Sequence, residues 1–212
     1  MKPTDPTDFT AREQRTLTLF MVGKLIATCG GEGLCRVRNL SVGGLMLETC
    51  MPLTLGEQVV VELRGTETLS GAVVWAREGR AGIAFHQPVI VEDLVRTAPR
   101  LGSRLLKVCQ PRGPRVTVDC PIEVQLDSGR IDARLTDISQ GGARVALPLM
   151  PQRDERVVLM IPGLPLKLAI VRWVGAEVGF AFAEPLPFAL LSEWLMVRAA
   201  GEYRDDEAAE FA

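Results

Sequence analysis

The sequence has few aromatic side chains and a single histidine, and its charges nearly cancel. Aromatic residues make up 5% of the 212 residues, His86 is the only histidine, and the formal net charge is −2. Proteins that bind single-stranded nucleic acids combine a broad basic groove with stacked aromatic rings. We therefore expect no nucleic acid polymer as a partner.

The sequence also lacks an apolar run long enough to cross a bilayer, which takes about 20 residues as a helix. Lys24 interrupts the apolar run at 17–27, and Glu193 interrupts the run at 188–197. Residues 1–5 contain no apolar stretch of the kind found in signal peptides. We expect no membrane span and a cytoplasmic protein, whose oligomeric state the sequence does not define.

Nothing in the sequence favours an enzyme or a metalloprotein. The five cysteines do not have the spacing of a zinc site, and we expect them to be reduced thiols. Ser41 and Ser139 have no histidine partner in either half of the chain that would activate a nucleophile. The glycine-rich phosphate loops of nucleotide-binding enzymes are missing as well. We predict no catalytic residues, no metal and no enzymatic activity.

The chain contains an internal repeat. Pairs of similar segments follow one another in the same order at offsets of 97–100 positions (179 − 82 and 112 − 12 are the extremes). Such a constant offset predicts two homologous domains of about a hundred residues. The paired landmarks are Arg12-x-x-Arg15 and Arg112-x-x-Arg115, Asn39–Gly44 and Asp137–Gly142, Trp75 and Trp173, and Gly82 and Gly179.

Each repeat alternates apolar and polar residues with a period of two, which is typical of half-buried strands. Such segments lie at 34–38, 45–48, 58–63, 131–135 and 143–147, with glycine or proline between them. Short strands with frequent turns predict a small barrel or sandwich. A helical period is present at 187–195 and, more weakly, at 91–95. Because Trp75 and Trp173 stand in apolar strand segments, we expect both in the core.

The repeated hexapeptide combines a polar acceptor, a hydroxyl and two glycines. It consists of Asn39, Ser41, Gly43 and Gly44 in the first repeat, and of Asp137, Ser139, Gly141 and Gly142 in the second. One interpretation is a turn that merely connects two strands. The other is a binding loop, in which glycine lets the backbone approach a flat ligand. Taken alone, the hexapeptide favours the connecting turn.

Arginine accounts for 20 of the 24 cationic residues. A GC-rich genome raises arginine content without any function, but the distribution along the chain is uneven. The segment 94–118 has no acidic residue. Guanidinium groups bind phosphate through two N–H groups and stack on planar rings. We therefore expect an anion site at this segment, whose cations are Arg96, Arg100, Arg104, Lys107, Arg112 and Arg115.

Taken together, each repeat resembles a PilZ domain, the bacterial receptor family for cyclic di-GMP. The family pattern has an arginine pair before the first strand, then Asp/Asn-x-Ser-x-x-Gly, a tryptophan strand, a Gly-x-x-Phe strand and a closing helix. The arginine pair and the hexapeptide are 24 residues apart in the first repeat (39 − 15) and 22 in the second (137 − 115). The resemblance implies a mainly β chain of two tandem six-stranded antiparallel β-barrels, each closed by a short C-terminal helix.

The corresponding domain boundaries divide the chain into five parts. We expect a flexible N-terminus at 1–10, a first PilZ-like domain at 11–98, a basic linker at 99–111, a second PilZ-like domain at 112–200 and an acidic tail at 201–212. In one interpretation, the first domain is a degenerate, structural copy.

The resemblance also implies where cyclic di-GMP would bind. In the second domain, Arg112 and Arg115 would hold phosphates and stack on bases. Asp137 and Ser139 would read a guanine edge beside Gly141 and Gly142. Arg100 and Arg104 would be auxiliary phosphate contacts. The first domain has weaker counterparts in Arg12, Arg15, Asn39, Ser41, Gly43 and Gly44.

One departure from the family leaves two hypotheses open. Both arginine pairs are Arg-x-x-Arg, one residue shorter than the family spacing, with Ala11 and Pro111 at the aligned position. The first hypothesis is a cyclic di-GMP receptor that signals to an effector protein of motility, biofilm or polysaccharide machinery. The second is a degenerate scaffold that binds a protein partner without nucleotide. The shorter spacing favours the scaffold, whereas the intact hexapeptide at Asp137 and the basic linker favour the receptor.

Overall fold

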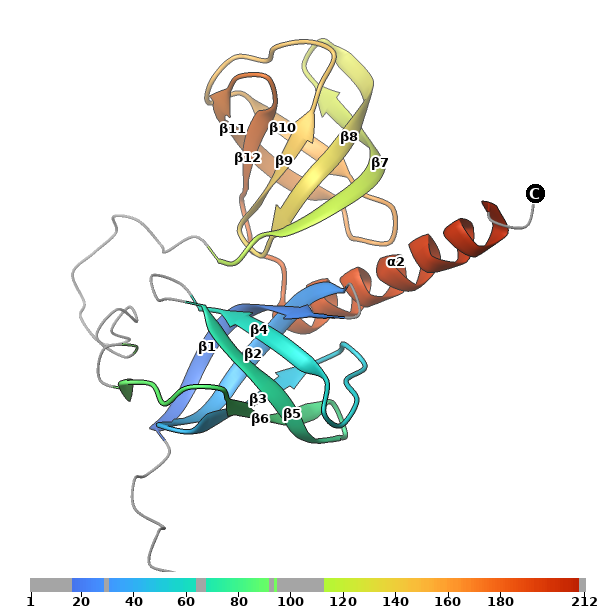
Figure 1. The fold of residues 1–212 in the computed structure, drawn as a ribbon. Helices are drawn as coiled ribbons and strands as arrows, with labels where there is room; N and C mark the ends of the chain where they lie inside the picture. The colour runs from blue at the N-terminus through green and yellow to red at the C-terminus, as the bar shows by residue number, and fades with distance from the viewer. Residues whose placement is uncertain (1–16, 29–30, 64–67, 92–93, 95–112, 210–212) are drawn as a thin grey trace, which may run out of the picture.

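The structure is a computed structural model that describes residues 17–28, 31–63, 68–91, 94 and 113–209 (Figure 1). The predicted N-terminal segment 1–10 and basic linker 99–111 lie outside the described residues. So do five of the candidate site residues, namely Arg12, Arg15, Arg100, Arg104 and Arg112.

The described strands form two closed antiparallel barrels, as the repeat predicts. Barrel 1 has the strand order β1-β2-β3-β6-β5-β4, and barrel 2 has the equivalent order β7-β8-β9-β12-β11-β10. The strands of barrel 1 are β1 (Leu17–Ala27), β2 (Glu32–Ser41), β3 (Gly44–Thr49), β4 (Gln58–Glu62), β5 (Leu69–Arg77) and β6 (Arg80–Phe85). The strands of barrel 2 are β7 (Val116–Leu126), β8 (Gly129–Ser139), β9 (Gly142–Ala146), β10 (Arg156–Met160), β11 (Lys167–Val174) and β12 (Val178–Phe182).

The two barrels share their irregularities as well as their order. Register shifts occur between Val37 and Asn39 in β2 and between Leu135 and Asp137 in β8, directly before the hexapeptides. Equivalent shifts separate Val73 from Trp75 in β5 and Val171 from Trp173 in β11. A bulge in one strand turns the following side chains to the other face of the sheet. In both barrels, equivalent sequence positions therefore lie on the outer surface.

The inward side of each strand is apolar, and the outward side is mixed. In β4, Val59 and Val61 are fully buried, and in β10 the equivalent Val157 and Leu159 are buried in the same way. Each barrel closes around its own cluster of such side chains. The strand alternation predicted at 58–63 is therefore confirmed, and burial of this inner face is the main contribution to the stability of each barrel.

The two tryptophans that the sequence places in the core lie on the outside of the barrels. Trp75 and Trp173 are only partly buried, and each indole covers a glycine of the neighbouring strand. The prediction is wrong because the bulge before each tryptophan reverses the alternation set by Val73 and Val171, which do point inward.

A helix, α2 (Phe188–Ala209), follows barrel 2 directly after Pro187. Its buried residues include Leu191, Trp194 and Leu195, within the helical period predicted at 187–195, and Trp194 Nε1 donates a hydrogen bond to the Pro162 carbonyl oxygen (2.8 Å). The helix is longer than the short closing helix expected, since it takes in residues 201–209 of the predicted tail. Within the described residues, no helix has the length and apolar character needed to cross a membrane.

The equivalent helix of barrel 1 is described only in part. Of residues 91–95, Val91 and Leu94 are described, both with helical backbone. The Leu94 amide donates to the Ile90 carbonyl oxygen (3.4 Å), and its side chain is buried in the core of barrel 1. The two described residues of this segment, Val91 and Leu94, therefore have the backbone that the weaker helical period predicts.

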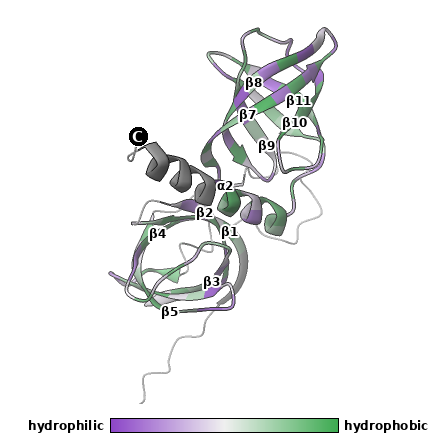
Figure 2. Ribbon diagram, turned by 90° about the vertical axis from the view of Figure 1, so that its right-hand side faces the viewer, coloured by the Kyte–Doolittle hydropathy of each residue, from purple (hydrophilic) through white to green (hydrophobic). Residues whose placement is uncertain are grey.

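Helix α2 also contacts barrel 1, so it joins the two barrels (Figures 1 and 2). Leu34 of β2 is 1% exposed because it packs into the cluster formed by barrel 2 and α2. The Arg36 guanidinium carbon lies 4.3 Å from the centroid of the Phe188 ring, at the first residue of the helix. Barrel 1 is thus attached to barrel 2 through the start of α2.

Candidate functional site

A row of paired residues crosses five neighbouring strands of barrel 2 and includes Asp137 of the predicted site. Trp173 of β11 is paired with Gly179 of β12, Gly179 with Arg144 of β9, Arg144 with Asp137 of β8, and Asp137 with Thr117 of β7. Side chains of directly opposed residues lie within reach of one another. The strand register therefore brings Arg144 beside Asp137.

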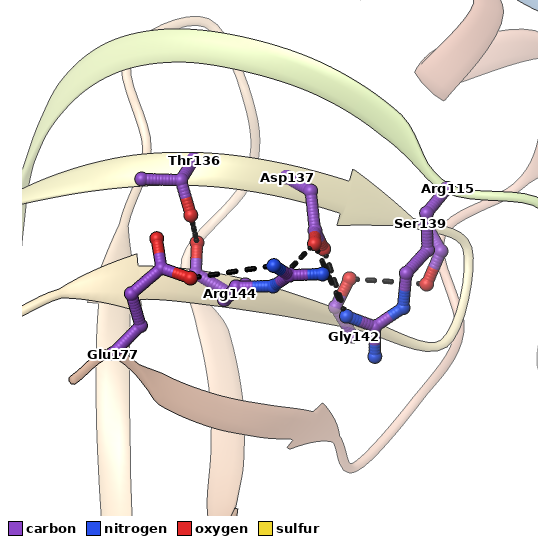
Figure 3. A network of polar contacts seen from close by, with 7 residues as sticks. All are labelled: Arg115, Thr136, Asp137, Ser139, Gly142, Arg144 and Glu177. Carbon is purple, nitrogen blue, oxygen red and sulfur yellow. Dashed lines mark hydrogen bonds and ion pairs between the residues drawn. The ribbon is translucent and has the colours of Figure 1, made fainter. Parts of the chain in front are cut away.

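A chain of four charged groups is built on this row (Figure 3). Arg115 Nη1 donates to Asp137 Oδ1 at 2.9 Å and lies 3.3 Å from Oδ2. Arg144 Nε forms an ion pair with Asp137 Oδ2 at 2.6 Å. Arg144 Nη1 in turn donates to Glu177 Oε2 at 3.3 Å, just before β12. We call these four residues the arginine–carboxylate chain.

The arginine–carboxylate chain is buried at its centre and accessible at its ends. The Asp137 side chain is 9% exposed, whereas those of Arg115 and Arg144 are 28% and 41% exposed. A carboxylate with so little access to water must be paired to remain charged. Asp137 meets that need with two arginines, one of which, Arg115, directly precedes β7.

The serine of the hexapeptide is satisfied within its own turn. Ser139 Oγ donates to the Gly142 carbonyl oxygen at 3.1 Å, and Ser41 Oγ donates to the Gly44 carbonyl oxygen at 3.0 Å in barrel 1. Ser139 is 4% exposed. The hydroxyl therefore stabilises the connection between two strands, as the turn interpretation holds, and its oxygen keeps lone pairs that can accept.

The two glycines of each hexapeptide differ in the space around their Cα atoms. A Cβ on Gly142 would stand 2.2 Å from the Phe180 carbonyl oxygen, and one on Gly44 would stand 2.4 Å from that of Ile83. A Cβ on Gly141 or on Gly43 would meet nothing within 4 Å. The second glycine is thus required by the adjacent strand, and the first leaves an open patch of backbone at the surface.

The hexapeptide turn of barrel 2 is tied to the approach to α2. The Leu186 amide donates to the Gln140 carbonyl oxygen at 2.7 Å, and Gln140 Nε2 donates to the Leu186 carbonyl oxygen at 3.0 Å. Phe188 begins the helix two residues later. The candidate site is therefore connected by hydrogen bonds to the segment that leads into the inter-barrel contact.

Barrel 1 carries a different set of side chains on the equivalent row. Asn39 stands where barrel 2 has Asp137, and it is paired with Met46 instead of an arginine. The charges of barrel 1 gather instead around Glu48, which ion-pairs with Arg38 at 2.7 Å, Arg80 at 3.6 Å and Arg36 at 4.0 Å. The hydrogen bond from Arg38, together with the nearby charges of the three arginines, lowers the pKa of the Glu48 carboxyl below its usual value.

The structure brings together part of the predicted site of barrel 2 and adds two residues. Arg115, Asp137, Ser139 and Gly142 lie within one corner of the barrel (Figure 3). Arg144 and Glu177 were missed by sequence reasoning. The signal for Arg144 was its position two residues after Gly142 in an alternating strand, which points it outward beside the hexapeptide. No such signal marks Glu177, which is brought in by the β9–β12 pairing.

No metal or redox chemistry is indicated in the part of the chain that the structure describes. It contains no group of three or more histidine, cysteine or acidic side chains able to hold a metal ion. Cys35 and Cys50 are free thiols, and burial raises the pKa of the Cys35 thiol to about 12. That thiol is therefore protonated and unreactive at neutral pH.

The arrangement in barrel 2 suits a ligand that carries both N–H donors and anionic oxygens. The Asp137 carboxylate can accept two parallel N–H bonds, and the guanidinium groups beside it can bind phosphate oxygens. The model of the PilZ domain family matches the chain twice, at residues 10–97 and 110–195. The chain therefore belongs to the PilZ domain family, with two domains in tandem.

A comparison with solved structures gives matches over most of the chain. Borreliella burgdorferi PlzA in complex with c-di-GMP is 10% identical over 84% of this chain and 88% of its own, with a TM-score of 0.34. Escherichia coli YcgR in complex with c-di-GMP is 12% identical over 91% and 89%, also with a TM-score of 0.34. Bacillus subtilis MotI/DgrA, an inhibitor of motility, is 15% identical over 87% and 99%, with a TM-score of 0.33. No curated protein matches the chain.

Proposed function

We propose that this chain is a receptor for cyclic di-GMP that binds its ligand on the outer face of barrel 2. The observation that carries the proposal is the buried Asp137 carboxylate, held between Arg115 and Arg144 in a domain of the PilZ family. The ligand combines guanine, with N–H donors on one edge, and anionic phosphates. Barrel 2 has the complementary groups within a single corner.

Each group has a distinct role in this proposal. The Asp137 carboxylate accepts the two N–H donors of a guanine edge, as carboxylates do with paired donors. The Arg115 guanidinium binds a phosphate and can stack on a base. Ser139 and Gly141 lie beside the guanine position. At Gly141 the backbone is open to the ligand, since a side chain is absent there. Arg112, Arg100 and Arg104, which lie outside the described residues, stay in the proposal as further phosphate contacts.

Binding would proceed by exchange of partners, because Asp137 is already paired in the free protein. The guanine N–H groups take the place of Arg115 on the carboxylate. Arg115 is then released toward the phosphates, so that no charge is left unpaired. In such an exchange, Arg115 makes different contacts in the free and bound states. A ligand can shift a protein between two states only through such differences.

Barrel 1 has a supporting part in this account. Met46 and Asn39 leave its row without the charge pair that barrel 2 has. We therefore propose one functional nucleotide site, in barrel 2, with barrel 1 as the structural copy. The signal would be read by an effector protein in the cytoplasm, and the chain itself would act by binding rather than by catalysis.

One observation favours the scaffold as a second candidate. Asp137 and Ser139 both have partners within the free protein, which is the arrangement expected if the chain of ion pairs is purely structural. In that case a protein partner would bind the same face without nucleotide, consistent with the shortened Arg-x-x-Arg spacing.

Isothermal titration of the full chain with cyclic di-GMP tests the proposal. We expect saturable binding by the wild type and its loss in Arg115→Ala. Arg130→Ala is the matched control, because it removes an exposed arginine that is paired with Glu123 at the start of β8 (3.0 Å). An absence of binding by the wild type would leave the scaffold as the function. Unchanged affinity in Arg115→Ala would contradict the assigned role of Arg115.

A further inference from the structure

We propose that Arg144 is a positioning residue. It keeps the Asp137 carboxylate paired and oriented when Arg115 leaves that carboxylate to bind a phosphate of the ligand. The part that concerns the ligand rests on the proposed function. The closest contacts of the two arginines are with different oxygens of Asp137: Arg115 Nη1 donates to Oδ1 at 2.9 Å and over a longer distance of 3.3 Å to Oδ2, whereas the Arg144 ion pair is formed with Oδ2 at 2.6 Å. Loss of one contact therefore need not disturb the other.

Burial makes a second arginine necessary. With 9% of its side chain exposed, the Asp137 carboxylate is poorly hydrated. A buried charge that loses its partner is strongly destabilised, whereas one that keeps a partner is not. If Arg115 were the only partner, its departure toward a phosphate would carry that cost. Arg144 removes the cost because it remains on Oδ2.

The Arg144 guanidinium has Glu177 as a second carboxylate partner, and this distinguishes it from Arg115. Its Nη1 donates to Glu177 at 3.3 Å, and its backbone carbonyl oxygen accepts a hydrogen bond from the Thr136 hydroxyl at 3.3 Å. In the described part of the chain, the ion pairs of Arg115 are with Asp137 alone. Arg144 is therefore the anchored partner of Asp137, and Arg115 is the partner that can leave.

Barrel 1 supplies an internal comparison. Where Asp137 is replaced by the uncharged Asn39, Arg144 is replaced by Met46, so the charged pair is present or absent as a unit. Met46 is paired with Gly82 just as Arg144 is paired with Gly179. Methionine is therefore compatible with the barrel at this position, and Arg144→Met is a substitution that the fold accommodates.

The test combines nucleotide affinity with stability of the free protein. We expect Arg144→Met to weaken cyclic di-GMP binding by at least about tenfold, measured well below the melting temperature. Arg144→Lys should restore most of that loss, because it returns the positive charge. Arg130→Met, which removes an exposed arginine seven residues before Asp137 on the same strand, should bind as the wild type does.

The stability measurement separates this inference from the proposed function. Without nucleotide, Arg144→Met should lower the melting temperature more in the Asp137 background than in an Asp137→Asn background, where only the contact with Glu177 is lost. If the wild type binds no nucleotide, the proposed function fails. The anchoring of Asp137 by Arg144 is then tested by the melting temperatures alone, and additive effects of the two substitutions would overturn it. If the wild type binds and Arg144→Met binds equally well, the positioning role is overturned, even where the melting temperature falls.

Discussion

The indole ring of Trp173 covers Gly179 of the neighbouring strand. A Cβ on Gly179 would stand 2.0 Å from the ring nitrogen of Trp173. Trp75 and Gly82 are related in the same way in barrel 1, at 2.1 Å. In barrel 2, the covered glycine is the residue paired with Arg144, so the ring closes the end of the row that contains the candidate site.

Gly179→Ala should displace the Trp173 ring into solvent. We expect a loss of stability of about 1–3 kcal/mol, in the range found for overpacking, and a red shift of tryptophan emission. Thermal unfolding and fluorescence measure the two effects. Gly175→Ala in the same hairpin is the control, because its Cβ would have only ordinary contacts, the nearest at 3.8 Å. Equal stability and emission in the two variants would contradict the packing described.

The two glycines of the hexapeptide should respond differently to alanine. Gly142→Ala places a Cβ against the backbone of β12, which cannot move without breaking the barrel, and should cost about 1–3 kcal/mol or more. Gly141→Ala has open space and should be near neutral for stability. Thermal denaturation of both variants measures the difference, and similar losses in both would argue against the assignment of the steric role to Gly142.

Glu48 should make barrel 1 sensitive to acid. Its pKa is lowered in the folded protein, chiefly by the hydrogen bond from Arg38, so its ionised form contributes stability at neutral pH. That contribution begins to be lost as the pH falls below the ordinary pKa of 4.5 and is gone below the folded value. Glu48→Gln should therefore be less stable than the wild type at pH 7, with a gap that narrows toward pH 3.

Thermal melts of wild type and Glu48→Gln between pH 3 and pH 7 check this behaviour. Glu193→Gln, a substitution on the exposed side of α2, controls for the general effect of removing one negative charge. A gap between the wild type and Glu48→Gln that stays constant with pH would contradict the account.

Gln140 should stabilise the approach to α2. Gln140→Val removes the side-chain bond to Leu186 and keeps the backbone bond, and valine occupies the equivalent position 42 of barrel 1. We expect a loss of about 0.5–1.5 kcal/mol, typical of one hydrogen bond. Hydrogen exchange should show faster exchange of the Leu186 amide. Unchanged exchange would mean that the side-chain bond contributes nothing to holding this segment.

The fold could be predicted from the sequence because its signals are local and occur twice. The alternation in strands such as 58–63 and the constant offset between the hexapeptides are readable without coordinates. The outward position of Trp75 and Trp173 could not be predicted from the sequence. A bulge inserts one residue into the strand, so the side chains that follow it lie on the opposite face of the sheet. In an apolar segment, the sequence does not indicate where a bulge occurs.

The candidate site was predictable only where its residues belong to a motif. Asp137 and Ser139 are recognised because they belong to the hexapeptide. Arg115 is recognised from the number of residues that separate it from the hexapeptide. Arg144 and Glu177 depend on the register of β9 with β8 and β12, which is a tertiary property. The pairing of Asp137 with two arginines in the free protein could not be read from spacing either.

The central claim is that barrel 2 binds cyclic di-GMP through Asp137, and titration calorimetry on matched variants of the intact chain tests it. Asp137→Asn gives barrel 2 the residue that barrel 1 has, and Asn39→Ala alters the equivalent position of barrel 1. We predict saturable binding by the wild type and Asn39→Ala, and none by Asp137→Asn. Undiminished binding by Asp137→Asn, or its loss in Asn39→Ala alone, would contradict the claim.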